Sequence, residues 1–287
     1  MPIAHVVRDH LAKFTRTCIV KGGWRLAPHL NRMFEPTTAT VRLPDVGLCQ
    51  LDLRDEDLLR IYWSGLEREE REVMRLTREL LPVNGVYCDL GANIGFQTLS
   101  ASRHLQAGGG QVLAFEPHPC NFEFLSANVA LNGLQNVHLE QLGLSDAPGK
   151  LRVQGSDVPG NWSVASHGAH EFEIDLVRLD DYLERHPVAR IDLVKMDIEG
   201  SEVRALRGAR QTLRTFRPAL IFEANPSWLR RMGTSIGELF ETIRELDYTI
   251  HALPRCLADL EPALPTREAA AIDANAWPNL LALPRRS

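Results

Sequence analysis

The chain has 287 residues, of which 44% are hydrophobic and 24% charged, a balance that indicates one globular core domain rather than a fibrous or disordered chain. Its 32 basic and 37 acidic residues give a net charge of −5, so we expect no general basic surface for nucleic acid. Five widely spaced cysteines without a Cys-x-x-Cys pair argue against a disulfide framework or a zinc site. No apolar run reaches the roughly 20 residues of a membrane helix. We therefore expect a cytoplasmic protein with reduced thiols.

Residues 1–54 are expected to form an accessory segment ahead of the core domain, residues 55–287. Up to about residue 40, apolar side chains recur at near-helical spacing among basic ones. This spacing predicts an amphipathic helix that packs on its own domain or provides a surface for a second copy or another partner. The alternating segments 40–43 and 48–53 then flank a Pro-Asp-Val-Gly turn and predict a β-hairpin.

The rest of the chain predicts an α/β core. In chain order we expect helices over 55–62 and 73–81, a strand over 86–90, a helix over 98–102, a strand over 111–115, a helix over 120–131, strands over 137–144 and 172–176, a helix over 179–183, a strand over 191–196, a helix over 203–209, a strand over 218–223, a helix over 235–246, and strands over 248–251 and 279–283. Alternating strands and helices at this spacing imply parallel strands with right-handed crossovers, and the last strand can return antiparallel. The polar, glycine-rich segment 149–169 is expected to be a lid or substrate loop.

The first core strand ends in a glycine-rich turn, residues 91–95. Gly91 and Gly95 lack a Cβ, so the backbone can adopt positive φ and approach a ligand, and the following helix presents unpaired N–H groups. A dinucleotide site would have its middle glycine where this sequence has Asn93, and Asp89 beside the turn would repel a pyrophosphate. The turn therefore favours a nucleoside that carries positive charge.

The second core strand ends in Glu116-Pro117, where a carboxylate can accept hydrogen bonds from both hydroxyls of a ribose. Asp89 and Glu116 together indicate S-adenosylmethionine. An acid after the third strand is well placed to receive the adenine amino group, although Ser145-Asp146 is equally typical of a simple turn. The expected cofactor-binding residues are Asp89, Gly91, Asn93, Gly95, Phe96, Glu116, Pro117, Ser145 and Asp146.

A second group of acids follows the fourth core strand. In a doubly wound sheet this strand lies beside the first, so Asp197 and Glu199 are expected at the same edge, next to the methionine end of the cofactor. Glu223 ends the fifth strand in the same way. Glu202 is also explained by a simple preference for the first turn of the next helix.

Several segments taken together resemble the FkbM-type methyltransferase family. They are Val-Tyr-Cys-Asp-Leu-Gly-Ala-Asn-Ile-Gly-Phe (86–96), Phe-Glu-Pro (115–117), Leu-Asp-Asp-Tyr (179–182), Asp-Leu-Val-Lys-Met-Asp-Ile-Glu-Gly-Ser-Glu (192–202) and Asn-Leu-Leu-Ala-Leu-Pro (279–284). The resemblance runs from about Asp55 to Pro284, and residues 195–202 are its most specific part. It implies a Rossmann-like class I methyltransferase fold, a doubly wound seven-stranded sheet with the last strand antiparallel. It also implies S-adenosylmethionine-dependent O-methylation of natural products or glycans.

The reaction that this resemblance implies is attack of an acceptor hydroxyl, on a sugar, glycan or polyketide, on the methyl group of a sulfonium. A hydroxyl is a poor nucleophile, so a nearby carboxylate is expected to remove its proton. We expect Asp197 or Glu199 to be this base, with Lys195 orienting the carboxylates and Glu223 completing the site.

Other interpretations stay open at this point. The acids could hold a divalent metal ion that binds the acceptor oxygen, but their spacing does not require one. His138 and His251 lie in strand-like runs and are expected to be packed or surface residues rather than bases. The chain could instead be an N-methyltransferase, although it lacks the Asn/Asp-Pro-Pro-aromatic turn of many such enzymes, or a non-catalytic module that binds the cofactor. A nicotinamide dehydrogenase is disfavoured by the incomplete glycine pattern.

Overall fold

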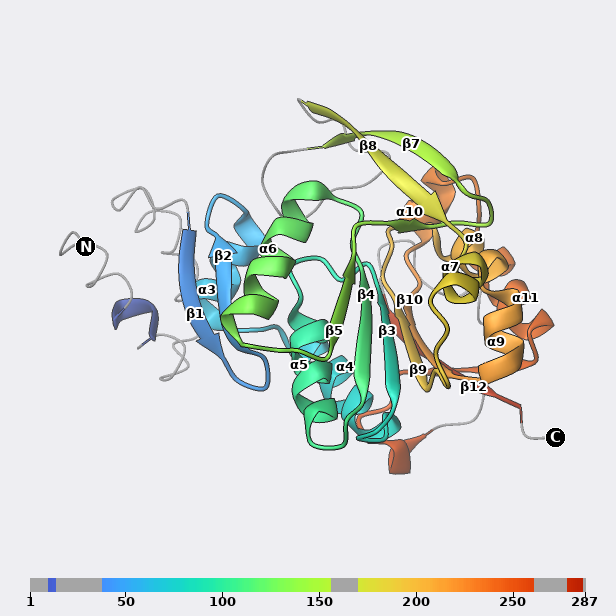
Figure 1. Cartoon of the computed structure of the whole chain (residues 1–287), viewed down its shortest axis with the longest axis horizontal. Coiled ribbons are helices and arrows are strands. Elements are labelled where there is room, and N and C mark those ends of the chain that lie inside the picture. The colour runs from blue at the N-terminus through green and yellow to red at the C-terminus, as the bar shows by residue number, and fades with distance from the viewer. Residues whose placement is uncertain (1–9, 14–37, 156–169, 261–277, 286–287) are drawn as a thin grey trace.

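The computed structural model describes residues 10–13, 38–155, 170–260 and 278–285 (Figure 1). Most of the helix predicted within residues 1–40 lies outside these ranges, and within it only residues 10–13 are described, as helical. In the described ranges no helix is both long and apolar enough to cross a membrane.

A seven-stranded sheet forms the centre of the molecule. Its strands are β3 (Val86–Leu90), β4 (Gln111–Phe115), β5 (Val137–Glu140), β9 (Leu193–Met196), β10 (Ala219–Glu223), β11 (Tyr248–Ala252) and β12 (Asn279–Pro284). They stand in the order β11-β12-β10-β9-β3-β4-β5. The five strands from β10 to β5 pair in parallel, and β12 is antiparallel to both of its neighbours. This arrangement confirms the predicted doubly wound sheet with an antiparallel last strand.

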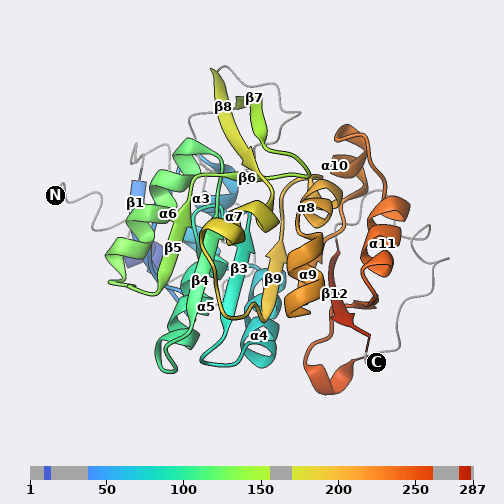
Figure 2. The ribbon, with the colours of Figure 1, turned by 45° about the vertical axis from the view of Figure 1, so that its right-hand side comes forward.

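Helices cover both faces of the sheet because side chains alternate along each strand. Tyr87 and Ile221 belong to one core cluster, and their neighbours Cys88 and Phe222 to the other. The first cluster contains α3 (Glu56–Ser64), α4 (Arg68–Leu80), α5 (Phe96–Gln106) and α6 (Pro119–Leu131), and the second contains α7 (Leu179–Arg185), α8 (Glu202–Gly208), α9 (Arg210–Phe216), α10 (Pro226–Arg231) and α11 (Ile236–Glu245). A short 3-10 helix spans Leu257–Asp259. Figure 2 shows the sheet between these two layers.

The predicted hairpin is present as β1 (Thr38–Leu43) and β2 (Gly47–Asp52), which pair antiparallel and lie beside α6 (Figure 1). Asn128 and Asn132, four residues apart on one face of α6, bind its edge. The amide of Asn132 accepts from the N–H of Leu48 (3.0 Å) and donates to its carbonyl (2.7 Å). The amide of Asn128 does the same at Gln50 (2.6 and 3.3 Å). These amides satisfy backbone groups that the edge of a hairpin would otherwise leave unpaired.

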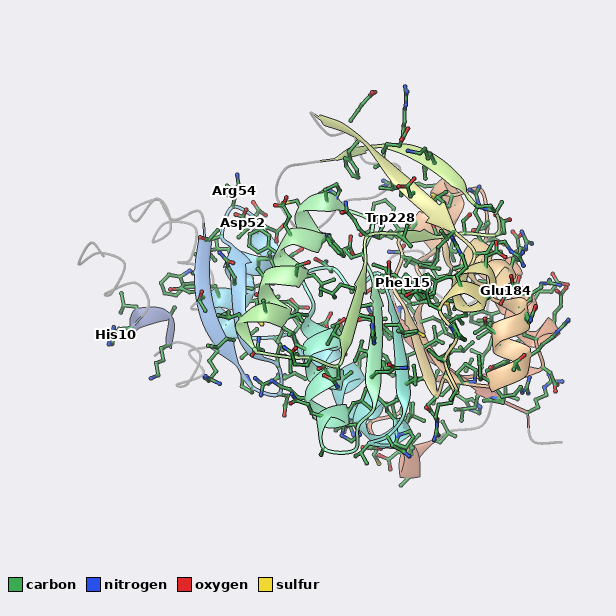
Figure 3. All side chains as sticks on the ribbon, viewed as in Figure 1. His10, Asp52, Arg54, Phe115, Glu184 and Trp228 are labelled. Atoms are coloured by element: carbon green, nitrogen blue, oxygen red, sulfur yellow. The ribbon has the colours of Figure 1, made fainter. Side chains whose placement is uncertain are left out.

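The end of the hairpin is held by a buried carboxylate. Asp52 is fully buried and accepts hydrogen bonds from the backbone N–H and the guanidinium Nε of Arg54, each at 2.9 Å to Oδ1. Figure 3 shows the two side chains together at this end of the hairpin. Their pairing fixes the chain where it turns from β2 toward α3.

The predicted single strand over residues 137–144 is wrong in its extent. β5 ends at Glu140, and Gly143–Leu144 form β6, which pairs in parallel with β8 (His170–Val177) in a separate three-stranded sheet of order β6-β8-β7. The apolar pattern continues through both strands, so it does not show where the pairing partner changes.

The predicted loop over residues 149–169 is also partly wrong, because Gly149–Gly155 form strand β7; residues 156–169 lie outside the described ranges. β7 pairs antiparallel with β8, and Lys150 forms ion pairs with Glu173 (2.6 Å) and Asp175 (3.5 Å). A strand with one face in solvent has half of its residues polar, which is why its sequence suggested a loop. In Figure 2 the two strands project beyond the upper edge of the large sheet. Helices α9 and α10, of seven and six residues, were not predicted.

Candidate active site

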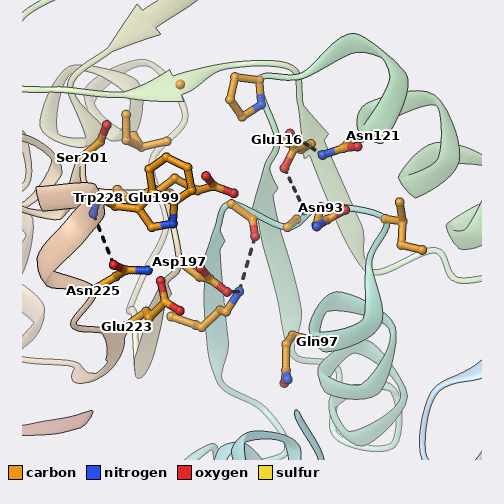
Figure 4. A pocket seen from close by; sticks show the side chains of 18 of the residues that line it. Asn93, Gln97, Glu116, Asn121, Asp197, Glu199, Ser201, Glu223, Asn225 and Trp228 are labelled. Atoms are coloured by element: carbon orange, nitrogen blue, oxygen red, sulfur yellow. Dashed lines mark hydrogen bonds and ion pairs between the residues drawn. The ribbon is translucent and has the colours of Figure 1, made fainter. Parts of the chain in front are cut away.

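The acids that end the core strands meet at one edge of the sheet. Leu90 lies opposite both Phe115 and Met196, and Met196 lies opposite Phe222, so these four parallel strands end at the same level. The residues that follow them, Gly91, Glu116, Asp197 and Glu223, all line a cavity of about 340 Å³. Figure 4 shows Glu116 on one side of it and Asp197, Glu199 and Glu223 on the other. The sheet register thus brings together acids that are distant in sequence.

The glycine-rich turn forms one wall of the cavity and requires glycine at its start. Gly91 has φ +80°, and a Cβ at this position would lie 2.0 Å from the backbone oxygen of Asp197. Gly95, at φ +101°, is the N-cap of α5. Asn93 also has a positive φ, 52°, which asparagine tolerates better than most residues. The turn can therefore pass close to β9 and still leave backbone exposed to a ligand.

Glu116 is the strongest match to a nucleoside-binding acid. Its carboxylate is buried, and it accepts the N–H of His118 at Oε1 (2.9 Å) and the N–H of Asn93 at Oε2 (2.8 Å). Burial raises the pKa of Glu116 to about 7, although these N–H groups act to lower it. The amide Nδ2 of Asn121 also donates to Oε1, at 3.5 Å, so Oε2 has a lone pair left for one ribose hydroxyl, and Oε1 could accept a second if this long contact is replaced. A buried acid with this capacity in the cavity wall fits a nucleoside.

The other predicted cofactor residues divide into two groups. Phe96, Pro117 and Ser145 line the cavity with Glu116. Asp146 is exposed, does not line the cavity, and accepts a hydrogen bond from the hydroxyl of Ser145 (3.2 Å). Gly95 is not part of the lining either, and its contribution is to begin α5.

Asp89 lies beneath the cavity and holds Lys195. It is fully buried and absent from the lining, and it accepts the hydroxyl of Thr98 at 2.6 Å. The Nζ of Lys195 lies 3.8 Å from Asp89 and 3.3 Å from Asp197. Burial alone would lower the pKa of Lys195, but Asp197, Asp89 and Glu70 raise it above its ordinary range, so the lysine stays charged. Lys195 therefore joins an acid below the cavity to one in its wall.

Glu199 occupies a constrained position on the loop after β9. It has φ +53°, in the left-handed region that glutamate seldom adopts. The loop is held by the buried carboxylate of Glu202, which accepts the N–H groups of Ile198 (3.2 Å) and Gly200 (3.3 Å). The Oε2 atom of Glu199 is buried and has no hydrogen-bond partner within the described ranges. This unpaired oxygen in the cavity wall is available to a ligand.

The carboxyls of Glu199 and Glu223 share a negative environment. Burial, with the nearby charges of Asp197 and Glu223, raises the pKa of Glu199 to about 9. Burial and the charges of Asp197 and Glu202 raise the pKa of Glu223 to about 8. An opposite charge nearby would favour their ionised forms. The site therefore favours a cationic ligand.

Sequence reasoning did not identify several lining residues, notably Glu70, Gln97, Asn225 and Trp228. Glu70 lies in a run of charged residues at the start of α4, where nothing distinguishes it from its solvent-facing neighbours. Gln97 has a weak signal, because it is polar and directly follows the predicted cofactor residue Phe96. Asn225 caps α10 and places Trp228 near Glu199 in Figure 4.

Metal binding and histidine chemistry receive no direct support from the geometry. Over the residues that the structure describes, no group of three or more His, Cys, Asp or Glu side chains is arranged to hold a metal ion. His138 is exposed, and His251 is buried and contacts the hydroxyl of Thr249 at 3.0 Å. Neither histidine lines the cavity.

Comparison with known proteins places these features in a family. The model of the methyltransferase FkbM domain matches residues 89–250. The chain is 34% identical over 161 residues to methyltransferase sdnD of Sordaria araneosa (45% of this chain, 61% of that protein). It is 28% identical over 148 residues to hexuronic acid methyltransferase AglP of Haloferax volcanii (52% and 59%), and 30% identical over 205 residues to 31-O-demethyl-FK506 methyltransferase FkbM of Streptomyces tacrolimicus (60% and 73%).

Among solved structures, a methyltransferase FkbM from Methylobacillus flagellatus is similar with a TM-score of 0.44 and 20% identity, over 79% of this chain and 54% of that chain. The matched part of the chain spans about six tenths of the length of sdnD and of AglP.

Proposed function

We propose, from the fact that the chain belongs to the FkbM methyltransferase family, that it transfers a methyl group from S-adenosylmethionine to a hydroxyl of a sugar, glycan or polyketide-type acceptor. The observation that carries this proposal is the pair of opposed acidic walls in one cavity, with Glu116 on one side and Glu199 on the other. The first wall suits a ribose and the second suits an acceptor hydroxyl. One relative is named for the methylation of a hexuronic acid, and another for 31-O-demethyl-FK506, a name that places the methyl group on an oxygen.

The cofactor would be held by residues at the ends of β3 and β4. Glu116 would accept the ribose hydroxyls, the backbone of the turn at Gly91 would pass beside the ligand, and Ser145 would lie at the nucleobase end. S-adenosylmethionine supplies a methyl group already activated by its sulfonium, so the protein has mainly to position the acceptor and exclude water. Leu151, Ile174 and Leu176 of β7 and β8 contribute an apolar part of the wall.

Glu199 is our candidate for the general base. Asp197 is engaged by Lys195 at 3.3 Å, whereas Glu199 offers a buried oxygen without a hydrogen-bond partner in the described part of the chain. Its pKa of about 9 makes the ionised carboxylate a stronger base than an ordinary glutamate, and a positive charge in the cavity would help it to ionise. Glu199 would accept the hydroxyl proton. Lys195 would hold the neighbouring carboxylate of Asp197 through their ion pair.

Binding of S-adenosylhomocysteine, measured by calorimetry, and transfer of a labelled methyl group to a panel of sugars, polyketide alcohols and amines test this function. We expect binding of the nucleoside and label on an oxygen. Failure to bind S-adenosylhomocysteine would contradict the proposed use of S-adenosylmethionine, and with it the proposed function. Binding without transfer to any acceptor would instead favour a non-catalytic module, and label found only on nitrogen would favour an N-methyltransferase.

The affinity for S-adenosylhomocysteine should decrease as the pH is lowered. Burial raises the pKa of Glu116 to about 7, so the carboxylate that would accept the ribose hydroxyls is present above pH 7 and lost below it. We therefore expect the Kd to rise about tenfold between pH 8 and pH 6. Calorimetry of the wild type and of Glu116→Gln checks this, since the variant should bind more weakly with little pH dependence. Equal pH dependence in both proteins would assign the effect to another group.

A further inference from the structure

A second cavity, also of about 340 Å³, adjoins the first beyond Lys195 and Asp197. It lies between the start of α4, the start of α5 and the ends of β9 and β10. It shares six lining residues with the first cavity: Glu67, Glu70, Gln97, Lys195, Asp197 and Glu223. Glu69, Val73 and Asn279 line only the second cavity, and Val73 is its one apolar residue among the residues that the structure describes.

The side-chain oxygen of Gln97 has no hydrogen-bond partner among the described residues. Its side chain is only 5% exposed, and its Nε2 donates to the carboxylate (2.6 Å) and the backbone carbonyl (3.2 Å) of Glu70. Its Oε1 is buried and has no hydrogen-bond partner among the described residues. A buried carbonyl oxygen left unpaired is costly, so this atom is a natural acceptor for a donor group of a ligand in the cavity. Hydroxyl and ammonium groups are such donors.

Carboxyl groups dominate the wall of the second cavity, although burial and acidic neighbours raise the pKa of one of them, Glu223, to about 8. Among the described residues, this wall contains five carboxyl groups, from Glu67, Glu69, Glu70, Asp197 and Glu223, and one cation, Lys195. Lys195 is already paired with Asp197 and Asp89, and Glu67 is paired with Arg60 at 2.7 Å. A carboxylate on a ligand would therefore meet like charges, whereas hydroxyl or ammonium groups would meet acceptors.

We propose that this second cavity binds the acceptor, and that it selects a polyhydroxylated molecule that is neutral or carries an amine, such as a sugar or amino sugar, over one that carries a carboxylate. This inference rests on the proposed methyl transfer and narrows its substrate. The wall offers many acceptors and one apolar side chain, so a largely apolar polyketide would leave the acids without donors. A hexuronic acid would add a negative charge beside them.

Three methyl glycosides with the same ring test the selection: methyl α-glucopyranoside, its 2-amino-2-deoxy analogue and the corresponding glucuronide. Ligand-observed NMR titrations would be run on the whole chain, saturated with S-adenosylhomocysteine, at pH 7.5 and low salt. We expect the neutral and amino glycosides to bind at least about tenfold more tightly than the glucuronide, and added salt to narrow the difference between the amino glycoside and the glucuronide. Equal or tighter binding of the glucuronide, or no binding of any of the three, would overturn the inference.

Charge variants test whether the acids of the second cavity cause this selection between glycosides. Glu70→Gln should improve binding of the glucuronide relative to the amino glycoside by about fivefold. The control Glu184→Gln makes the same charge change on the exposed face of α7, away from the cavities (Figure 3), and should leave the ratio unchanged. Glu69→Gln, an exposed position that lines only the second cavity, replaces Glu70→Gln if that variant does not fold. An unchanged ratio in the folded cavity variant would contradict the proposed selection.

The titration of S-adenosylhomocysteine that precedes each experiment separates the two proposals. If the nucleoside does not bind, the methyl-transfer function fails. If it binds and the order of the glycosides is wrong, only the choice of acceptor fails.

Discussion

Replacing Glu199 by Gln is expected to lower kcat/KM for methyl transfer by about 100-fold or more, while binding of S-adenosylhomocysteine is retained. Glutamine keeps the size of the side chain but cannot take a proton from the acceptor. The measurement uses labelled S-adenosylmethionine and the acceptor identified by the labelled-methyl panel. The matched variant Asp197→Asn tests the second candidate base, next to Lys195.

The pH profile makes this assignment specific. The raised pKa of Glu199, about 9, means that the base form is present above pH 9 and is progressively lost as the pH falls. The sulfonium of bound S-adenosylmethionine acts to lower this pKa, so in the wild type kcat/KM for the acceptor should rise about tenfold per pH unit up to a pKa below 9, and in Glu199→Gln this slope should disappear. If Glu199→Gln keeps both the slope and most of the activity while Asp197→Asn loses them, then Asp197 is the base.

Lys195→Met is expected to lower the free energy of unfolding at pH 7 by about 3–5 kcal/mol. The substitution removes the cation that lies 3.8 Å from the fully buried Asp89 and 3.3 Å from Asp197. The hydrogen bond from Thr98 to Asp89 remains, but a buried charge without a counterion is costly. Urea unfolding monitored by circular dichroism measures the loss. Lys150→Met, which removes an exposed ion pair with Glu173, is the matched control and should change stability little.

Lowering the pH should reduce the loss of stability caused by Lys195→Met. Burial raises the pKa of Asp89 and Lys195 acts to lower it, so removal of the lysine should raise that pKa further. The cost of burying the ionised carboxylate is full above the folded pKa, decreases as the pH falls below that value, and is gone below the lower pKa of the unfolded chain. The double variant Lys195→Met, Asp89→Asn should recover part of the loss at pH 7. A deficit that does not depend on pH, with no recovery in the double variant, would show that Lys195 acts through packing rather than charge.

Much of the fold could be predicted from local patterns. The hairpin, the parallel core strands and the antiparallel final strand were all expected, and Glu116, Asp197 and Glu223 do line one cavity. Helices α9 and α10 were not expected, and two strand assignments were wrong: the division of residues 137–144 between two sheets and the strand over Gly149–Gly155. In both cases the segment forms strand, but its partner lies far along the chain and leaves no mark on the local sequence.

The sequence by itself determined most of the core strands and helices and which acids follow the strands, because side-chain periodicity is local and parallel strands end at a common edge. Only the tertiary structure decided that Asp89 lies beneath the cavity with Lys195, that Glu70 and Gln97 line both cavities, and that Glu199 is buried among other acids. Burial, ion pairing and pKa depend on distances between residues that are remote in sequence. Those distances are set only when the helices pack against the sheet.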